Sequence, residues 1–283
     1  MQRFHAHGSL LLSGEYVLLN GAKALAIPTG KGQTLHVQTS ESKGIQWLAK
    51  NHLDQVMFQG DLLNKQADLS FIDRLIQACL DCGKSLPSVS ATTTLDFDPT
   101  WGWGSSASLI ALVAQWFRVD ALWLHNLVSQ GSGYDVACAM ADGPLCFQSG
   151  QAEAVDLSHW PLEHIGFIHL GNKQDSQQAV SNYLKNPADP GVIQAISDLT
   201  DAMVNARSVN SLRQAMDDHE RIMSDHLCMT TAKQLHFPQA AFSVKSLGAW
   251  GGDFVMVLTD DPSELNYIAS SHTHCHPWSS VAL

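Results

Sequence analysis

The sequence has few positively charged residues. Lysine and arginine number 16 against 27 aspartates and glutamates, which gives a formal net charge of -11 over 283 residues. An acidic surface repels a phosphate backbone, so we expect no nucleic-acid partner. A small anion is still an acceptable ligand, because backbone amides supply local positive potential whatever the net charge.

Long apolar segments are also missing. No stretch approaches 18 uncharged apolar residues, so we expect no membrane span and no membrane partner. Glu15 follows the leucine run at Leu10 to Leu12 too soon to leave room for a signal-peptide core. We therefore expect a cytoplasmic protein.

The cysteines lack the pairing that a zinc ribbon requires. Of the six cysteines only Cys79 and Cys82 are spaced C-x-x-C, and no second pair matches them. Apolar residues recur at helical spacing around this pair, so we expect reduced thiols buried on a helix over 68–82. The tail from His272 to His276 leaves metal binding and a solvated tail both open.

Hydrophobic residues make up 45% of the chain, enough for packed cores. Strand-like sequence covers 8–40, with Asn20-Gly21 as a hairpin turn and residues 28–32 as a loop. A Gly-, Ser- and Pro-containing stretch at 149–161 predicts a boundary between domains at 1–155 and 156–283. The remaining expected strands cover 88–97, 165–170, 240–245 and 253–258, with further short strands within 45–60. The expected helices cover 105–117, 121–128, 176–185, 190–204 and 208–226, with another beginning near residue 135. This order indicates an α+β fold.

The segment Gly102-Trp103-Gly104-Ser105-Ser106-Ala107-Ser108 lies between an expected strand and the clearest expected helix. Glycines allow a sharp turn, and the first amides of a helix attract phosphate. The pattern is typical of a phosphate-binding loop, and a serine-capped turn is the simpler interpretation. A dinucleotide pattern, G-x-G-x-x-A with Asp120 downstream, also fits. That pattern normally occupies a first βαβ unit, whereas a hundred residues precede it here.

Three further segments have a chemical interpretation. In Gly131 to Ala137 a small-residue loop leads to Asp135, which is suited either to accept a proton from an attacking hydroxyl or to cap a helix. In Lys245 to Phe254 three glycines precede a strand and permit close approach to a ligand. In His7 to Tyr16 a lone acid, Glu15, interrupts strand-like sequence.

Taken in order, these four segments resemble the GHMP kinases, the superfamily of galactokinase, homoserine kinase, mevalonate kinase and phosphomevalonate kinase. Residues 99–108 look like its Pro-x-x-x-Gly-Leu-Gly-Ser-Ser-Ala-Ser signature, with Trp103 in place of leucine. Gly133-Tyr134-Asp135-Val136-Ala137 is similar to the stretch that names the bacterial GYDIA group. The resemblance spans residues 4 to about 258.

The resemblance implies two α/β domains, the first like ribosomal-protein domain 2 and the second ferredoxin-like, with the active site between them. It implies ATP and Mg²⁺ and a small-molecule, mevalonate-like substrate. A homodimer is the default expectation for the oligomeric state. Asp135 would be the base, and Ser106 would lie near the metal and share in catalysis. The implied nucleotide contacts are Gly102, Trp103, Gly104, Ser105, Ser106, Ala107, Ser108, Gly248, Gly251 and Gly252. The residues implied near the acceptor are Ser9, Glu15, Ser132, Gly133 and Tyr134.

The chain departs from the family pattern in two places. Ser9 stands where the first motif usually has a lysine, whose charge Lys173 or Lys245 could replace. Between residues 121 and 133 no acid offers the usual metal-binding glutamate. Two hypotheses follow: an ATP-dependent small-molecule kinase, or a nucleotide-binding protein of the same fold that has lost catalysis.

Overall fold

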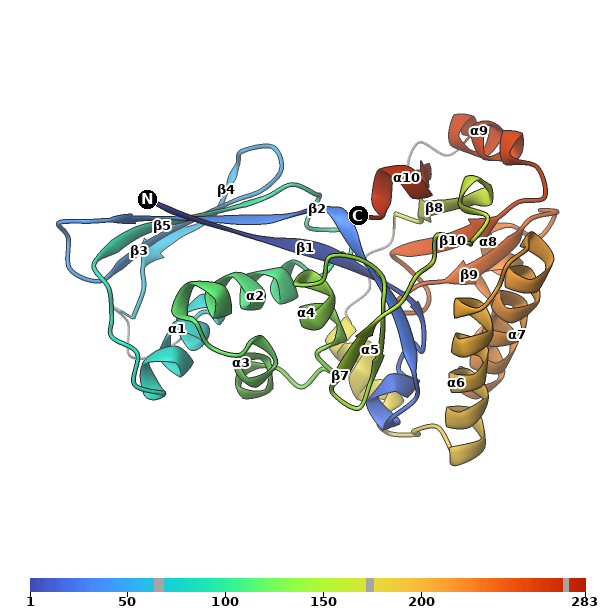
Figure 1. Cartoon of the computed structure of the whole chain (residues 1–283), viewed down its shortest axis with the longest axis horizontal. Coiled ribbons are helices and arrows are strands. Elements are labelled where there is room, and N and C mark those ends of the chain that lie inside the picture. Colours follow the sequence, from blue (N-terminus) through green and yellow to red (C-terminus); the bar gives the residue numbers. More distant parts are fainter. Residues whose placement is uncertain (64–68, 172–175, 272–274) are drawn as a thin grey trace. The chain divides into compact units, whose positions relative to one another are not determined.

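The computed structural model describes residues 1–63, 69–171, 176–271 and 275–283, which form two compact units (Figure 1). Unit 1 comprises Met1–Ser9, Lys31–Pro99 and Trp103–Met140, and unit 2 comprises Leu10–Gly30, Thr100–Gly102 and Ala141–Leu283. The two long strands β1 (Gln2–Ser13) and β2 (Ala24–Thr39) contribute to both units.

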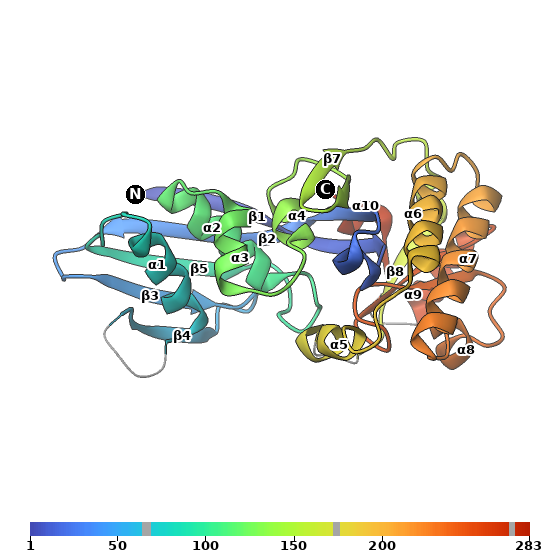
Figure 2. The same cartoon turned by 90° about the horizontal axis from the view of Figure 1, so that it is seen from below.

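Unit 1 is a sheet with helices on one face (Figures 1 and 2). Strand β5 pairs antiparallel with β2 and parallel with β3, and β4 pairs antiparallel with β3. Alternate residues of β5 are buried, as expected for a strand with one covered face. The elements are β3 (Ile45–Lys50), β4 (Val56–Asp61), β5 (Val89–Leu95), α1 (Phe71–Asp81), α2 (Ser105–Phe117), α3 (Ala121–Val128) and α4 (Tyr134–Ala139).

Helix α2 is the central helix of unit 1. It packs against α1, α3 and α4, and every residue from Ala107 to Ala114 is buried. A helix that is apolar on all sides belongs in a core. The start of α2 is therefore held in place by the core of the unit.

Unit 2 contains the remainder of β1 and β2, and β6 pairs with β2 and β7 with β6. It also contains an antiparallel sheet in the order β11-β8-β10-β9. Helices α6 and α7 pack on each other, and α7 packs on β9 (Figure 1). The elements are η1 (Val17–Asn20), β6 (Leu145–Gln148), β7 (Gln151–Ala154), η2 (Leu162–His164), β8 (Ile165–His169), α5 (Ser176–Tyr183), α6 (Pro190–Val204), α7 (Val209–Leu227), α8 (Ala232–His236), β9 (Ser243–Ser246), β10 (Phe254–Leu258), α9 (Pro262–Ser271), β11 (Cys275–Pro277) and α10 (Trp278–Val281).

The predicted α+β fold is confirmed, with two local corrections. Residues 16–19 form part of a turn and the 3-10 helix η1 instead of a strand, and Gly21, at φ 94°, ends it. The prediction of a loop at 28–32 is wrong, because β2 runs through these residues as one long strand. Pro28 has no amide hydrogen to donate, and its carbonyl accepts a hydrogen bond from the amide of Leu283 at 3.1 Å.

Two further expectations concern the cysteines and the membrane. Cys79 is buried on α1, where burial raises the pKa of its thiol to about 12, whereas Cys82 caps the helix and is exposed. Among the described residues, no helix combines the length and the apolar character that crossing a bilayer requires.

Candidate active site

The start of α2 presents the geometry of an anion site. Gly104 precedes the helix in the left-handed conformation at φ 72°, and Gly102 has φ 69°. The first intrahelical bond runs from Ser108 N to Gly104 O at 2.9 Å, so the amides of residues 105–107 have no partner within the helix. The side chain of Ser106 is exposed there.

Two predicted site residues from other segments meet this turn. A Cβ placed on Gly104 would lie 2.8 Å from Ser9 Oγ and 3.9 Å from Asp135 Cβ. Ser9 also donates its backbone N–H to the carbonyl of Trp103 at 3.1 Å. The structure thus brings Ser9, Asp135 and the start of α2 to one point in unit 1, although they are far apart in sequence.

Asp135 lies in the first turn of α4, immediately after Tyr134 and the left-handed Gly133. Burial raises the pKa of its carboxyl, and attraction from His125 together with hydrogen bonds from the amides of Val136 and Asp135 acts in the opposite direction. The Val136 amide donates to Asp135 Oδ1 at 3.0 Å. A carboxyl with a raised pKa is better suited to accept a proton than an ordinary aspartate.

His125 is a neighbour of this aspartate that the sequence analysis missed. It is 2% exposed on α3 and lies beneath the loop that leads to Asp135. A Cβ on Gly131 would lie 3.4 Å from its Nε2, and a Cβ on Gly133 would lie 3.4 Å from its Nδ1 and 2.8 Å from Leu122 Cδ2. The glycines of this loop are therefore explained by close packing on α3, and Ser132 between them accepts the Tyr134 amide at 3.4 Å.

Two residues of the 102–108 loop support it from within the unit. The hydroxyl of Ser108 is buried and donates to Gln33 Oε1 at 2.9 Å. Trp103 is 2% exposed, with its ring 5.7 Å from that of Phe97. Their contact with a nucleotide stays a prediction.

The structure gives the acidic residue of the dinucleotide pattern, Asp120, a different role. Asp120 caps α3, where its Oδ1 accepts the amide of Trp123 at 2.7 Å. The strands around the loop are also mostly antiparallel, in contrast to the parallel sheet of a dinucleotide-binding fold.

The glycine-rich loop of unit 2, residues 247–253, connects β9 to β10. Gly248 and Gly251 have φ of 64° and 94°, and the amide of Leu247 donates to Phe254 O at 3.1 Å to close the loop. Asp253 also has positive φ, 52°, and a Cβ on Gly102 would lie 2.6 Å from its Oδ2. A side chain at position 102 would therefore require the Asp253 carboxylate to move and would adopt a φ of 69°, which favours glycine.

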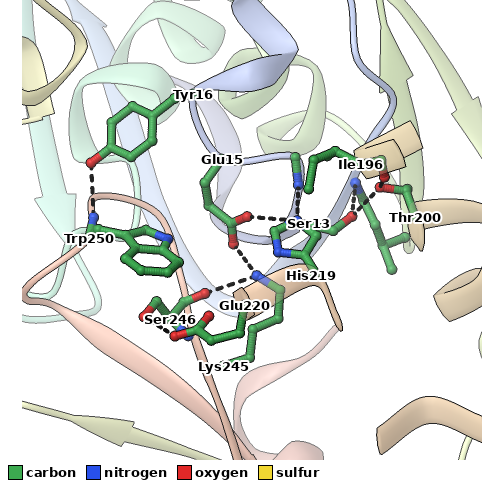
Figure 3. A network of polar contacts seen from close by, with 12 residues as sticks. Ser13, Glu15, Tyr16, Ile196, Thr200, His219, Glu220, Lys245, Ser246 and Trp250 are labelled. Carbon is green, nitrogen blue, oxygen red and sulfur yellow. Dashed lines mark hydrogen bonds and ion pairs between the residues drawn. The ribbon is translucent and has the colours of Figure 1, made fainter. Parts of the chain in front are cut away.

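Glu15 lies in unit 2, in a fully buried polar network (Figure 3). Its Oε1 is 2.6 Å from Lys245 Nζ, and its Oε2 is 3.3 Å from His219 Nε2. Lys245 also donates to the carbonyl of Ser246 at 3.0 Å, and Glu220 accepts both the amide and the hydroxyl of Ser246 at 3.0 and 2.7 Å. The carboxylate of Glu15 is thus paired within the protein, and its predicted place beside a phosphoryl acceptor stays a prediction.

Burial and Lys245 together set the protonation of this network. His219 accepts the amide of Gly14 at Nε2, 3.1 Å away, so that nitrogen carries no proton. Burial and the Lys245 charge lower the pKa of His219 well below its usual 6.5. Burial raises the pKa of Glu15 and of Glu220, while Lys245 lowers both. The positive charge of Lys245 therefore favours the ionised form of both buried carboxyl groups.

Metal candidates are few in the described part of the chain. It contains no group of three or more His, Cys, Asp and Glu side chains able to hold a metal ion. Ser106 is exposed at the start of α2 and stays the predicted ligand. Lys173 and His272 to His274 lie outside the described residues.

Comparison with known proteins identifies the fold. No protein-family model and no curated protein matches the sequence. The structure is similar to Streptococcus pneumoniae phosphomevalonate kinase in complex with phosphomevalonate and AMPPNP, with a TM-score of 0.76, 19% identity, and coverage of 100% of this chain and 98% of the kinase. It is similar to the Methanococcus jannaschii mevalonate kinase (TM-score 0.74, 13% identity, 98% of each chain) and to Lactococcus lactis galactokinase complexed with galactose (0.69, 12%, 95% and 88%).

These similar structures are all kinases of small molecules. The chain has their two-domain α+β architecture, the GHMP kinase fold, over almost its whole length. The fold predicted from the four sequence segments is thereby confirmed.

Proposed function

We propose that this protein is a GHMP kinase of the GYDIA group that transfers the γ-phosphoryl of ATP to a hydroxyl or phosphate of a small, mevalonate-like metabolite. The observation that carries the proposal is the convergence of Ser9, the start of α2 and Asp135 around Gly104. A phosphate cradle and a carboxylate at one point are the two parts that phosphoryl transfer to a hydroxyl requires. The similar structures support the proposal through their shared fold.

The residues at the start of α2 are suited to bind the phosphates of a nucleoside triphosphate. The amides of residues 105–107 point out of the helix, Gly104 brings the backbone close to a ligand, and Ser106 presents an exposed hydroxyl. Mg²⁺, entering with the nucleotide, would neutralise charge on the phosphates, with Ser106 as its protein ligand. Gly248, Gly251 and Gly252 are the residues of the glycine-rich loop that the resemblance to the GHMP kinases implies in nucleotide binding.

Asp135 would act on the acceptor. Its carboxylate takes the hydroxyl proton while the acceptor oxygen bonds to the γ-phosphorus, and the bond from that phosphorus to the β,γ-bridging oxygen breaks to release ADP. Ser132, Gly133 and Tyr134 precede Asp135 and would line the acceptor side. A base of this kind contributes about a hundredfold or more to the rate.

The test is ADP formation by the full-length protein with Mg²⁺-ATP over a panel that includes mevalonate, phosphomevalonate and galactose. Asp135→Asn should reduce turnover at least about a hundredfold. Asp142→Asn, a change at an exposed aspartate, is the matched control and should keep full turnover. Equal turnover by Asp135→Asn and the control would remove Asp135 from the role of base.

A second candidate function is nucleotide binding without catalysis. It is favoured by Ser9, which brings no charge to the point where the first motif usually has a lysine, and by Lys245, which is buried against Glu15. This candidate predicts thermal stabilisation by ATP or ADP with no phosphoryl transfer to any acceptor. ADP formation that depends on an acceptor would exclude it.

A further inference from the structure

Within unit 2, the turn formed by Gly14, Glu15 and Tyr16 is bonded to the glycine-rich loop at Trp250 and to strand β9, which precedes the loop, at Lys245 (Figure 3). The first is a hydrogen bond in which the amide of Trp250 donates to the hydroxyl of Tyr16 at 2.9 Å. Both residues are buried, at 9% and 3% exposure. The hydroxyl of Tyr16 therefore binds the backbone at the middle of the loop, where the Trp250 side chain is also packed in the core beside Tyr16.

The second point lies at the end of β9, where the loop begins. Glu15 binds the ammonium group of Lys245 at 2.6 Å, and the same ammonium group donates to the carbonyl of Ser246 at 3.0 Å. These contacts are shielded from solvent, because Glu15 and Lys245 are completely buried. The residue that precedes the loop is thus fixed by the charge pair.

The turn itself is rigidly held. Gly14 has φ 87°, a Cβ there would lie 2.8 Å from Ala24 Cβ, and its amide is bound by His219. Tyr16 has φ 60°, a conformation that is rare for an aromatic residue, and its ring stacks on that of Tyr183 at 5.5 Å. Strain of this kind persists only where the surroundings over-determine it, and it clusters at functional positions.

We infer that Glu15 and Tyr16 are positioning residues that hold the glycine-rich loop in its ligand-ready conformation, instead of contacting the phosphoryl acceptor. The inference rests on the proposed function for the link to ATP. A loop with Gly248, Gly251 and Gly252 has high conformational freedom, and fixing it before binding removes part of the entropic cost. The turn supplies that restraint from a segment more than 200 residues away in sequence.

Tyr16→Phe tests this by removing one oxygen atom. Loss of a typical net hydrogen bond corresponds to about a fivefold rise in the Kd for ATP. Amide hydrogen exchange in the peptide spanning 247–252 of the ligand-free protein should also become several-fold faster, since exchange reports local opening.

Tyr183→Phe is the matched control. Tyr183 is also buried, and its hydroxyl accepts the backbone amide of Ala188 at 3.2 Å and donates to Asn20 Oδ1, and neither partner lies in the loop. A merely structural role for Tyr16 predicts that the two variants lose similar thermal stability and leave loop exchange and ATP affinity alone. The positioning role predicts that only Tyr16→Phe changes the loop and the Kd.

The exchange and affinity measurements on the two variants either support or overturn the positioning role. Faster loop exchange and weaker ATP binding in Tyr16→Phe alone would support the inference. Unchanged loop exchange, or faster exchange with an unchanged Kd, would overturn it. Wild-type protein that binds no ATP would overturn the proposed function and the link to affinity, and the exchange measurement would still decide whether Tyr16 restrains the loop.

Discussion

Replacing Lys245 by methionine should strongly destabilise unit 2. The substitution removes the cation that contacts Glu15 at 2.6 Å and that also lowers the pKa of Glu220. Methionine fills a similar volume, so the main effect is electrostatic. Removing one partner of a buried ion pair costs about 3–5 kcal/mol of unfolding free energy, because the remaining charge is left without compensation.

The chain offers a control with the same geometry and a different environment. Lys23 Nζ also lies 2.6 Å from a carboxylate oxygen, that of Asp201, but the two side chains are 28% and 49% exposed. Solvent screens such a pair, so Lys23→Met should cost less than about 1 kcal/mol. The comparison separates burial from distance as the source of the effect.

Urea unfolding at pH 7.5 measures both variants. A second signature comes from pH: without Lys245 the raised pKa of Glu15 rises further, so the folded state binds a proton that the unfolded state releases. Stability of Lys245→Met should therefore increase as the pH falls toward the ordinary carboxyl range. The double variant Lys245→Met/Glu15→Gln should recover much of the loss. Equal costs for Lys245→Met and Lys23→Met would refute the reasoning.

Three other predictions address the two sites. Gly104→Ala should destabilise unit 1 by about 1–2 kcal/mol from its φ of 72° alone, and the added Cβ, 2.8 Å from Ser9 Oγ, should increase the loss. Adding Ser9→Ala should recover only that second part, and no recovery would contradict the contact. His219 stays neutral in the folded protein, whereas in the unfolded chain it is protonated with the ordinary pKa of 6.5. Lowering the pH from 7.5 to 5.5 should therefore reduce the free energy of unfolding by about 1.4 kcal/mol. His219→Gln should remove that share of the pH dependence in thermal unfolding, and an unchanged pH dependence would show that His219 titrates alike in both states. If Asp135 is the base, kcat/KM should fall at acid pH with a midpoint above the ordinary aspartate value of 3.8, because burial raises its pKa. A midpoint at or below 3.8 would refute that assignment.

Most of the fold could be predicted from local pattern. Helical spacing of apolar residues predicts the helix over 68–82 and the helix that follows Gly104, and the structure has α1 and α2 there. The failures occurred where tertiary pairing outweighs local signals. Residues 28–32 contain a proline and two glycines, which normally indicate a loop, yet β2 continues through them.

The candidate site could be predicted only in part. Glycines and a serine at a helix start are visible in the sequence, and so is the isolated Asp135. His125 was missed because a single histidine within the apolar helix α3 has no local feature that reveals its packing beneath Gly131 and Gly133. The pairing of Glu15 with Lys245 spans 230 residues, and no local pattern reports a contact of that separation.

The way that the chain alternates between the two units has a consequence for its synthesis. Unit 2 begins with Leu10–Gly30 and is completed only by the last residues, where Leu283 bonds to Pro28 and Ala282 pairs with Thr29. During synthesis the segment 10–27, with its buried residues Leu10 to Leu12 and Ala24 to Ile27, precedes residues 282 and 283 by more than 200 residues. Such a long interval exposes hydrophobic sequence, so production of this protein should depend on chaperones and on translation speed more than its size suggests.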